Sequence, residues 1–182
     1  MKNTQPDSSW AEPSIMEFQT SNLVDNALSA ALVKSPQLYF LPTIPESEIR
    51  VSEDISQPAV KNYSSKVMEV LLNNLSSRAG FSRSDLEVLL EAIQTKDFTE
   101  LDKYIKGYKD SYLAIGEISV PLTWKEIHKK YLSLLLGSAN IFEAVKSIDD
   151  DPLKATLALS QYRLVIDGMK EMVEQAAKLI PE

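Results

Sequence analysis

The stretch "IDDDPLKATLALSQYRLVI" (Ile148 to Ile166) joins the two longest amphipathic segments of the chain, and three aspartates in it precede Pro152. Asp151 is suited to cap a helix because its carboxylate can accept free backbone N–H groups, and proline favours the first helical position. Counted from the first aspartate, Lys154 and Ser160 replace the glycine and glutamate of a calcium-binding EF-hand loop. The run therefore predicts a helix start.

Amphipathic segments extend on both sides of this start, from Thr123 to Ile148 and from Pro152 to Leu179. Their apolar residues recur every three or four positions, as on one face of a helix. Short links between long helices favour antiparallel neighbours. We therefore predict an all-α fold, an antiparallel bundle of about five helices preceded by a short helix and an extended proline-containing arm.

Helix starts can also be located further upstream. Ser56 precedes a segment with Pro58 in its first turn, which indicates a capped helix. Two pairs have the spacing of a capping box, Ser84 with Glu87 and Thr123 with Glu126. We expect a helix to begin at each of these positions.

The chain divides into three predicted regions, a flexible polar arm (1–20), a short helix plus an extended strap (21–55) and the helical bundle domain (56–182). Prolines interrupt residues 36–58, so this part cannot form a long helix. It is interpreted either as a strap packed across the bundle or as an exposed segment that a partner binds by strand addition. The candidate partner-binding residues are Trp10, Leu38, Tyr39, Phe40, Leu41 and Ile44.

The amino-acid composition limits the classes of molecule that the chain is expected to bind. The 182 residues are 44% hydrophobic and 25% charged, which is typical of a globular protein, and the net charge is -7. An acidic surface disfavours nucleic acid and anionic membranes, so we expect neither as a partner. Lysine clusters in 103–109 and 125–130 are interpreted as solvated helix faces. No apolar run approaches the roughly 20 residues of a membrane span.

Residues for catalysis are scarce. The chain has no cysteine and five glycines, and His128 is its one histidine. His128 is predicted to be a surface or half-buried helix residue, with a general base or metal ligand as the alternative. Neither HExxH nor a phosphate-binding glycine motif occurs. We therefore expect no cofactor, no metal and no enzymatic activity.

Tyrosines recur four residues apart at Tyr104, Tyr108 and Tyr112 on one predicted helix. A tyrosine ring offers apolar area with a polar tip, so it suits core edges, interfaces and ligand grooves. Packing at the core edge is one interpretation of these residues. The other is a groove for a small molecule.

Three segments resemble a group of uncharacterised helical proteins from small-genome uncultivated bacteria: "SEIRVSEDISQPAVKNYSSKV" (47–67), "VPLTWKEIHKKYLSLLLG" (120–137) and "DDPLKATLALSQYRLVI" (150–166). The shared motifs are helix starts. The resemblance implies an extracytoplasmic domain tethered by a membrane helix upstream of this chain, while a cytoplasmic location stays open.

The leading hypothesis for function is therefore a non-enzymatic interaction or scaffold domain in a cell-envelope or secretion assembly. It would bind a protein partner or a second copy of itself. The alternative is a helical bundle that binds a small molecule in a tyrosine-lined groove.

Overall fold

Five α-helices make up most of residues 39–76 and 83–179, which are the residues that the computed structural model describes. They are α2 (Gln57–Leu71), α4 (Asp85–Thr95), α5 (Thr99–Gly116), α6 (Lys125–Lys146) and α7 (Pro152–Leu179). The predicted all-α class is confirmed, as are the five helices after residue 56. The predicted arm (1–20) and the short helix after it lie outside the described residues.

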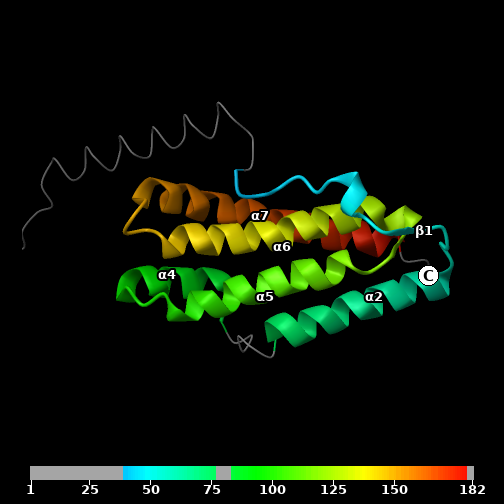
Figure 1. Ribbon diagram of the computed structural model, residues 1–182, viewed down its shortest axis with the longest axis horizontal. Helices are drawn as coiled ribbons and strands as arrows, with labels where there is room; N and C mark the ends of the chain where they lie inside the picture. The colour runs from blue at the N-terminus through cyan, green and yellow to red at the C-terminus, as the bar shows by residue number, and fades with distance from the viewer. Residues whose placement is uncertain (1–38, 77–82, 180–182) are drawn as a thin grey trace, which may run out of the picture. The chain divides into compact units, whose positions relative to one another are not determined.

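The aspartate run starts a helix as predicted. The carboxylate of Asp151 accepts a hydrogen bond from the backbone N–H of Lys154 at 2.9 Å, and α7 begins at Pro152. Asp149 forms an ion pair with Lys96, just after α4. The turn reverses the chain, so α6 and α7 lie side by side and antiparallel (Figure 1).

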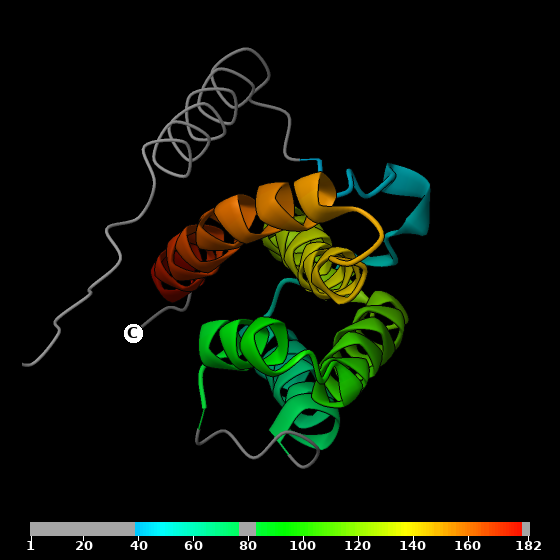
Figure 2. The ribbon, with the colours of Figure 1, turned by 90° about the vertical axis from the view of Figure 1, so that its left-hand side faces the viewer.

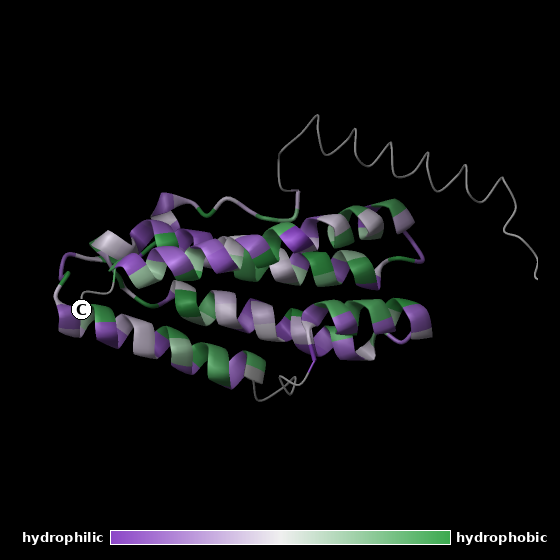
Figure 3. Cartoon of the chain, turned by 180° about the vertical axis from the view of Figure 1, so that it is seen from behind, coloured by the Kyte–Doolittle hydropathy of each residue, from purple (hydrophilic) through white to green (hydrophobic). Residues whose placement is uncertain are grey.

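The centre of the core lies on α6. This helix packs extensively against α7 on one side and α5 on the other, and Figure 2 shows this arrangement end-on. Phe142 of α6 is fully buried, and its ring stacks on Tyr104 of α5 with 5.2 Å between centroids. Hydrophobic and hydrophilic residues interleave along the helices (Figure 3), because each helix buries only one face.

Two of the three predicted helix starts are confirmed. The Ser56 hydroxyl accepts the N–H of Ala59 at the start of α2, and Ser84 and Glu87 form both hydrogen bonds of a capping box. The prediction of a capping box at Thr123 is wrong. Residues Leu122–Trp124 form a 3₁₀ turn, η3, that continues directly into α6, so Thr123 lies inside helical backbone and not at its boundary.

Residues 39–50 form a strap across the bundle, which is the packed interpretation of this segment. The backbone of Phe40 is held from both sides: its N–H donates to Gln161 of α7 at 3.4 Å, and its carbonyl accepts from Asn140 of α6 at 3.0 Å. Gly137 permits the close approach, because a Cβ there would lie 2.9 Å from Cγ of Leu41. After a 3₁₀ turn, η1 (Glu46–Glu48), the strap ends in a parallel strand pair, β1 (Val51–Ser52) with β2 (Val120–Pro121), which was not predicted.

Helix α2 is attached to this core less deeply than the others. Its only buried residues are Val60 and Tyr63, near its N-terminus. Further along, its inward residues are half-buried, and the helix widens into a π-helical segment, η2 (Leu72–Ser76). A large part of the surface of α2 therefore stays open.

Candidate functional site

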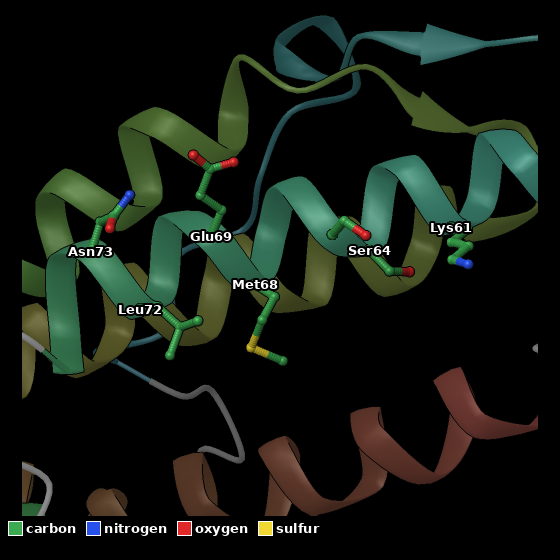
Figure 4. Close-up of a pocket in the computed structure, with 7 residues that line it drawn as sticks. Lys61, Ser64, Met68, Glu69, Leu72 and Asn73 are labelled. Carbon is green, nitrogen blue, oxygen red and sulfur yellow. The ribbon is translucent and has the colours of Figure 1, made fainter.

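A shallow, largely apolar depression in the described residues lies along α2. Seven residues line this depression of about 490 Å³, and all come from α2 and the first turn of η2 (Figure 4). We call this set the α2 face: Lys61, Ser64, Ser65, Met68, Glu69, Leu72 and Asn73. Their spacing of three and four residues spreads them over neighbouring rows of the less buried part of the helix.

Two apolar side chains dominate the C-terminal half of the α2 face. Met68 is 55% exposed and Leu72 is 52% exposed. They lie four residues apart and point to the same side of the helix in Figure 4, with Glu69 and Asn73 pointing to the other side. Neighbouring exposed apolar residues of this kind are a common feature of protein-contact surfaces.

The N-terminal half of the α2 face has a different character. Lys61 stands at its end, and the small side chains of Ser64 and Ser65 follow. Within the part of the chain that the structure describes, neither Lys61 nor Glu69 makes an ion pair or side-chain hydrogen bond. One end of the face therefore carries an uncompensated positive charge, and the other an uncompensated negative charge.

Most lysines of the two predicted clusters form ion pairs. On α5, Lys106 pairs with Asp110 and Lys109 pairs with Glu143 at 2.5 Å. On α6, Lys125 and Lys129 both contact Glu46 of the strap. Lys130 pairs with Glu171 of α7 at 2.8 Å. All of these cations are paired with acids, and all but Lys106 join different elements, so they do not form the continuous basic patch that a phosphate backbone requires.

His128 is fully buried, so the prediction of a surface or half-buried position is wrong. Its Nδ1 atom lies 2.9 Å from the hydroxyl of Tyr63 on α2, and its Nε2 atom has no hydrogen-bond partner among the described residues. Burial lowers the pKa of His128 to about 4 and raises the pKa of Tyr63. A neutral imidazole thus links α6 to α2 at a place that solvent does not reach.

The predicted tyrosine groove is not open in the structure. Tyr104 and Tyr108 are almost entirely buried, and both rings pack against Phe142. Tyr112 is half-buried and donates a hydrogen bond to Glu48 of the strap at 3.1 Å. These contacts correspond to the core-edge interpretation of the three tyrosines, because each ring already has protein neighbours.

Two buried tyrosines form hydrogen bonds with Asp85, a residue that was not predicted from the sequence to have a role. Asp85, the first residue of α4, accepts hydrogen bonds from Tyr108 of α5 and Tyr162 of α7. Burial raises the pKa of Asp85, and the two hydrogen bonds act in the opposite direction. Asp85 therefore joins three helices. No group of three or more histidine, cysteine or acidic side chains in the described ranges could hold a metal ion.

Three of the four candidate partner-binding residues that the structure describes are covered by the fold. Phe40 is 6% exposed and Ile44 is 4% exposed, and Leu41 is half-buried against the core. These apolar side chains are covered because the strap packs against the core of the same chain. Tyr39 is 62% exposed, and Trp10 and Leu38 lie outside the described residues.

Comparisons with protein-family models, with curated proteins and with solved structures give no match for this chain. The resemblance to helical proteins of uncultivated bacteria therefore stays a prediction. None of the helices in the described ranges combines the length and hydropathy that a membrane-spanning segment needs.

Proposed function

We propose that this chain is a non-enzymatic helical interaction domain and that the α2 face is its contact surface. The observation that supports this proposal best is the exposure of Met68 and Leu72 beside each other along a 490 Å³ depression. Covering such apolar surface lowers the free energy of the system by roughly 25 cal/mol for each Å² removed from water. A protein surface of matching shape would provide that cover.

The dimensions of the α2 face suit a helix as the binding partner. Residues 61 to 73 span about 18 Å along the axis at 1.5 Å per residue. Side chains at spacings of three and four form the ridges between which a second helix packs. We therefore propose that a helix of the partner packs along about three turns of α2.

The other polar clusters support a structural role more than a chemical one. His128 is buried beneath α2, and Asp85 is bonded to two phenols. A general base must come within hydrogen-bond reach of a substrate proton, and a fully buried ring does not. The buried tyrosines likewise give little support to a small-molecule groove.

The resemblance to extracytoplasmic domains extends the proposal to the cell envelope, where the domain would serve as a scaffold in an envelope or secretion assembly. Protease added to intact cells that express the full-length gene tests this location. The proposal requires digestion of the domain before lysis, and protection until lysis would contradict it.

A photo-crosslinking amino acid at position 68 tests the contact surface directly. We expect discrete adducts when the full chain carries the crosslinker in its native cells, because position 68 lies inside the proposed interface. Position 153 provides the control, since Leu153 is a similarly large residue, 69% exposed, on another helix. Equal labelling from both positions, or none from position 68, would overturn the proposal.

A further inference from the structure

We propose that α2 is an acid-released helix: protonation of His128 lifts the N-terminal half of α2 from a core that stays folded. The inference goes beyond the proposed contact surface, because it concerns the buried side of the same helix. It follows from the place of His128 beneath α2 and from how few buried residues hold that half of the helix.

His128 occupies a dry position between α6 and α2. Its ring is fully buried, its Nδ1 atom lies 2.9 Å from the hydroxyl of Tyr63, and its Nε2 atom has no hydrogen-bond partner among the described residues. A neutral imidazole has one N–H donor and one acceptor nitrogen, whereas an imidazolium has two N–H donors and a positive charge. A single hydroxyl cannot compensate for both changes, so protonation is unfavourable while α2 is in place.

The charged groups around the ring are directed elsewhere. The three charged residues of α2 are exposed to solvent: Lys61, Lys66 and Glu69. The charges of the neighbouring elements form ion pairs that do not include the ring: Lys125 and Lys129 of α6 with Glu46 of the strap, Lys130 of α6 with Glu171 of α7, and Arg50 before β1 with Glu117 after α5. The nearby phenols, Tyr63 and Tyr131, stay neutral in acid because burial raises the pKa of both. Among the described residues, a protonated His128 would therefore have no charged partner.

Few buried side chains hold the N-terminal half of α2 to the core. Val60 and Tyr63 are the only buried residues of α2, and both lie in its first two turns. None of the twelve largest fully buried side chains among the described residues belongs to α2. The core formed by α4 to α7 therefore keeps its main contacts when this half of α2 leaves.

The backbone at both ends of α2 permits a local movement. At the N-terminal end, three exposed residues (53–55) separate the strand pair from the cap at Ser56, so β1 can stay paired with β2. At the C-terminal end, η2 packs closely on α5, where a Cβ at Gly107 would lie 2.9 Å from the carbonyl oxygen of Asn74. We therefore expect the N-terminal half of α2 to lift while η2 stays attached.

Proton linkage gives the direction and the size of the effect. The pKa of His128 is about 4 with α2 in place and 6.5 for the free side chain. At pH 7 the ring is mostly neutral in both forms. Between pH 7 and pH 5 the form with α2 lifted takes up the proton and the closed form does not, so the lifted fraction should rise roughly 20-fold. Below pH 4 both forms are protonated and the rise levels off.

A single cysteine measures the lifting, because the chain has no cysteine of its own. Val60→Cys places a thiol beneath α2, and Val145→Cys places the same thiol in the core of α6. A pyridyl disulfide labels thiols even in acid. Its rate with the folded variant, divided by its rate with the urea-unfolded variant at the same pH, gives the fraction of time for which the thiol is exposed.

We expect the exposed fraction of the Val60→Cys thiol to rise roughly 20-fold from pH 7 to pH 5. At pH 5 it should exceed the exposed fraction of the Val145→Cys thiol by at least about tenfold, because local opening needs less free energy than complete unfolding. Equal fractions at positions 60 and 145 would overturn the proposal, since they would show that the whole chain unfolds together.

The double variant Tyr63→Phe/His128→Leu is the matched background for both thiols, because it removes the titrating ring together with the hydroxyl bonded to it. In this background we expect the exposed fraction at position 60 to rise less than about threefold between pH 7 and pH 5. An equal rise in the two backgrounds would overturn the role of His128. Circular dichroism at each pH shows whether a variant keeps its helices.

Hydrogen exchange of the unsubstituted chain tests the same movement without a cysteine. After correction for the intrinsic exchange rate, the amides of residues 60–66 should lose protection between pH 7 and pH 5 and stay less protected than the amides of α6. Equal protection of the two helices at pH 5 would contradict local release. Both measurements use the chain alone, so their outcome does not depend on whether the α2 face binds a partner.

Discussion

Helices α6 and α2 are both amphipathic, yet they are bound to the fold in different ways. Eleven residues of α6 are buried, among them Phe142 and Val145, and helices pack against it on two sides. Two residues of α2 are buried, and its remaining inward side chains are half-covered. The first helix is part of the core, and the second is fastened to it near one end.

The contacts that attach α2 to the core differ from those of α6 in chemistry as well as in depth of burial. The α6 contacts are apolar and close-packed, so their strength scales with the area removed from water. The deepest residue of α2 is Tyr63, whose hydroxyl bonds to His128 and whose ring meets Trp124 edge-on at 5.9 Å. The attachment of α2 thus depends on a buried histidine whose pKa is lowered, so it should respond to pH differently from the apolar packing around Phe142.

Truncation at the centre of α6 should have the largest effect. Phe142→Ala removes a fully buried ring that contacts both Tyr104 and Tyr108. We expect the free energy of unfolding to fall by about 3–5 kcal/mol, because a cavity adds to the lost transfer free energy. Urea denaturation followed by circular dichroism measures the change. A loss below about 1 kcal/mol would contradict the assignment of Phe142 to the core.

Acid should act mainly on the attachment of α2. The pKa of His128 is about 4 in the folded chain and 6.5 as a free side chain. Above pH 6.5 the ring is neutral in both states and has no effect. Between pH 6.5 and 4 only the unfolded chain takes up the proton, so stability falls as pH is lowered, by about 2 kcal/mol at pH 5. Below pH 4 this contribution levels off.

The double variant Tyr63→Phe/His128→Leu provides the control for the acid effect, because it removes the titrating ring without leaving the tyrosine hydroxyl unpaired. Its stability should change much less between pH 6.5 and 5, a range above the usual titration of carboxylates. Unfolding free energies at several pH values measure both slopes. Equal slopes in the two proteins would show that His128 is already accessible to protons.

How far the sequence predicts these features depends on whether the cause is local. The Asp151 cap and the Ser84 capping box need only residues three or four positions apart, and both were predicted. The burial of His128 depends on Tyr63, 65 positions away, and the hydrogen bonds of Asp85 depend on two other helices. Periodicity alone placed His128 one position off the apolar stripe and could not reveal that α2 covers it.

The α2 face is an intermediate case. Met68 and Leu72 are visible in the sequence as a second pair at helical spacing, outside the stripe that runs through Val60 and Tyr63. Their spacing marks a second apolar surface, but it cannot decide whether another helix of the same chain covers that surface. The arrangement of the other helices decides it, and that arrangement depends on contacts distant in sequence.

A matched pair of valines should show the contrast between the two helices with identical chemistry. Val145→Ala on α6 and Val67→Ala on α2 both remove two methyl groups, but Val145 is fully buried and Val67 is half-buried. We expect a loss of about 2–3 kcal/mol for Val145 and about 1 kcal/mol for Val67. Urea denaturation of both variants under one set of conditions gives the difference, and equal losses would remove the proposed distinction between core and attachment.

The smallest effect on stability should come from the α2 face itself. Met68→Ala removes a large apolar side chain, but 55% of that side chain is exposed in the folded chain. In the purified chain without a partner, we expect the free energy of unfolding to change by less than about 0.5 kcal/mol. In the presence of the partner, the same variant should weaken association, because the partner then loses its contact with the methionine. A residue that matters for association but hardly for folding is what the proposed contact surface requires, whereas a large loss in the purified chain would assign Met68 to the core.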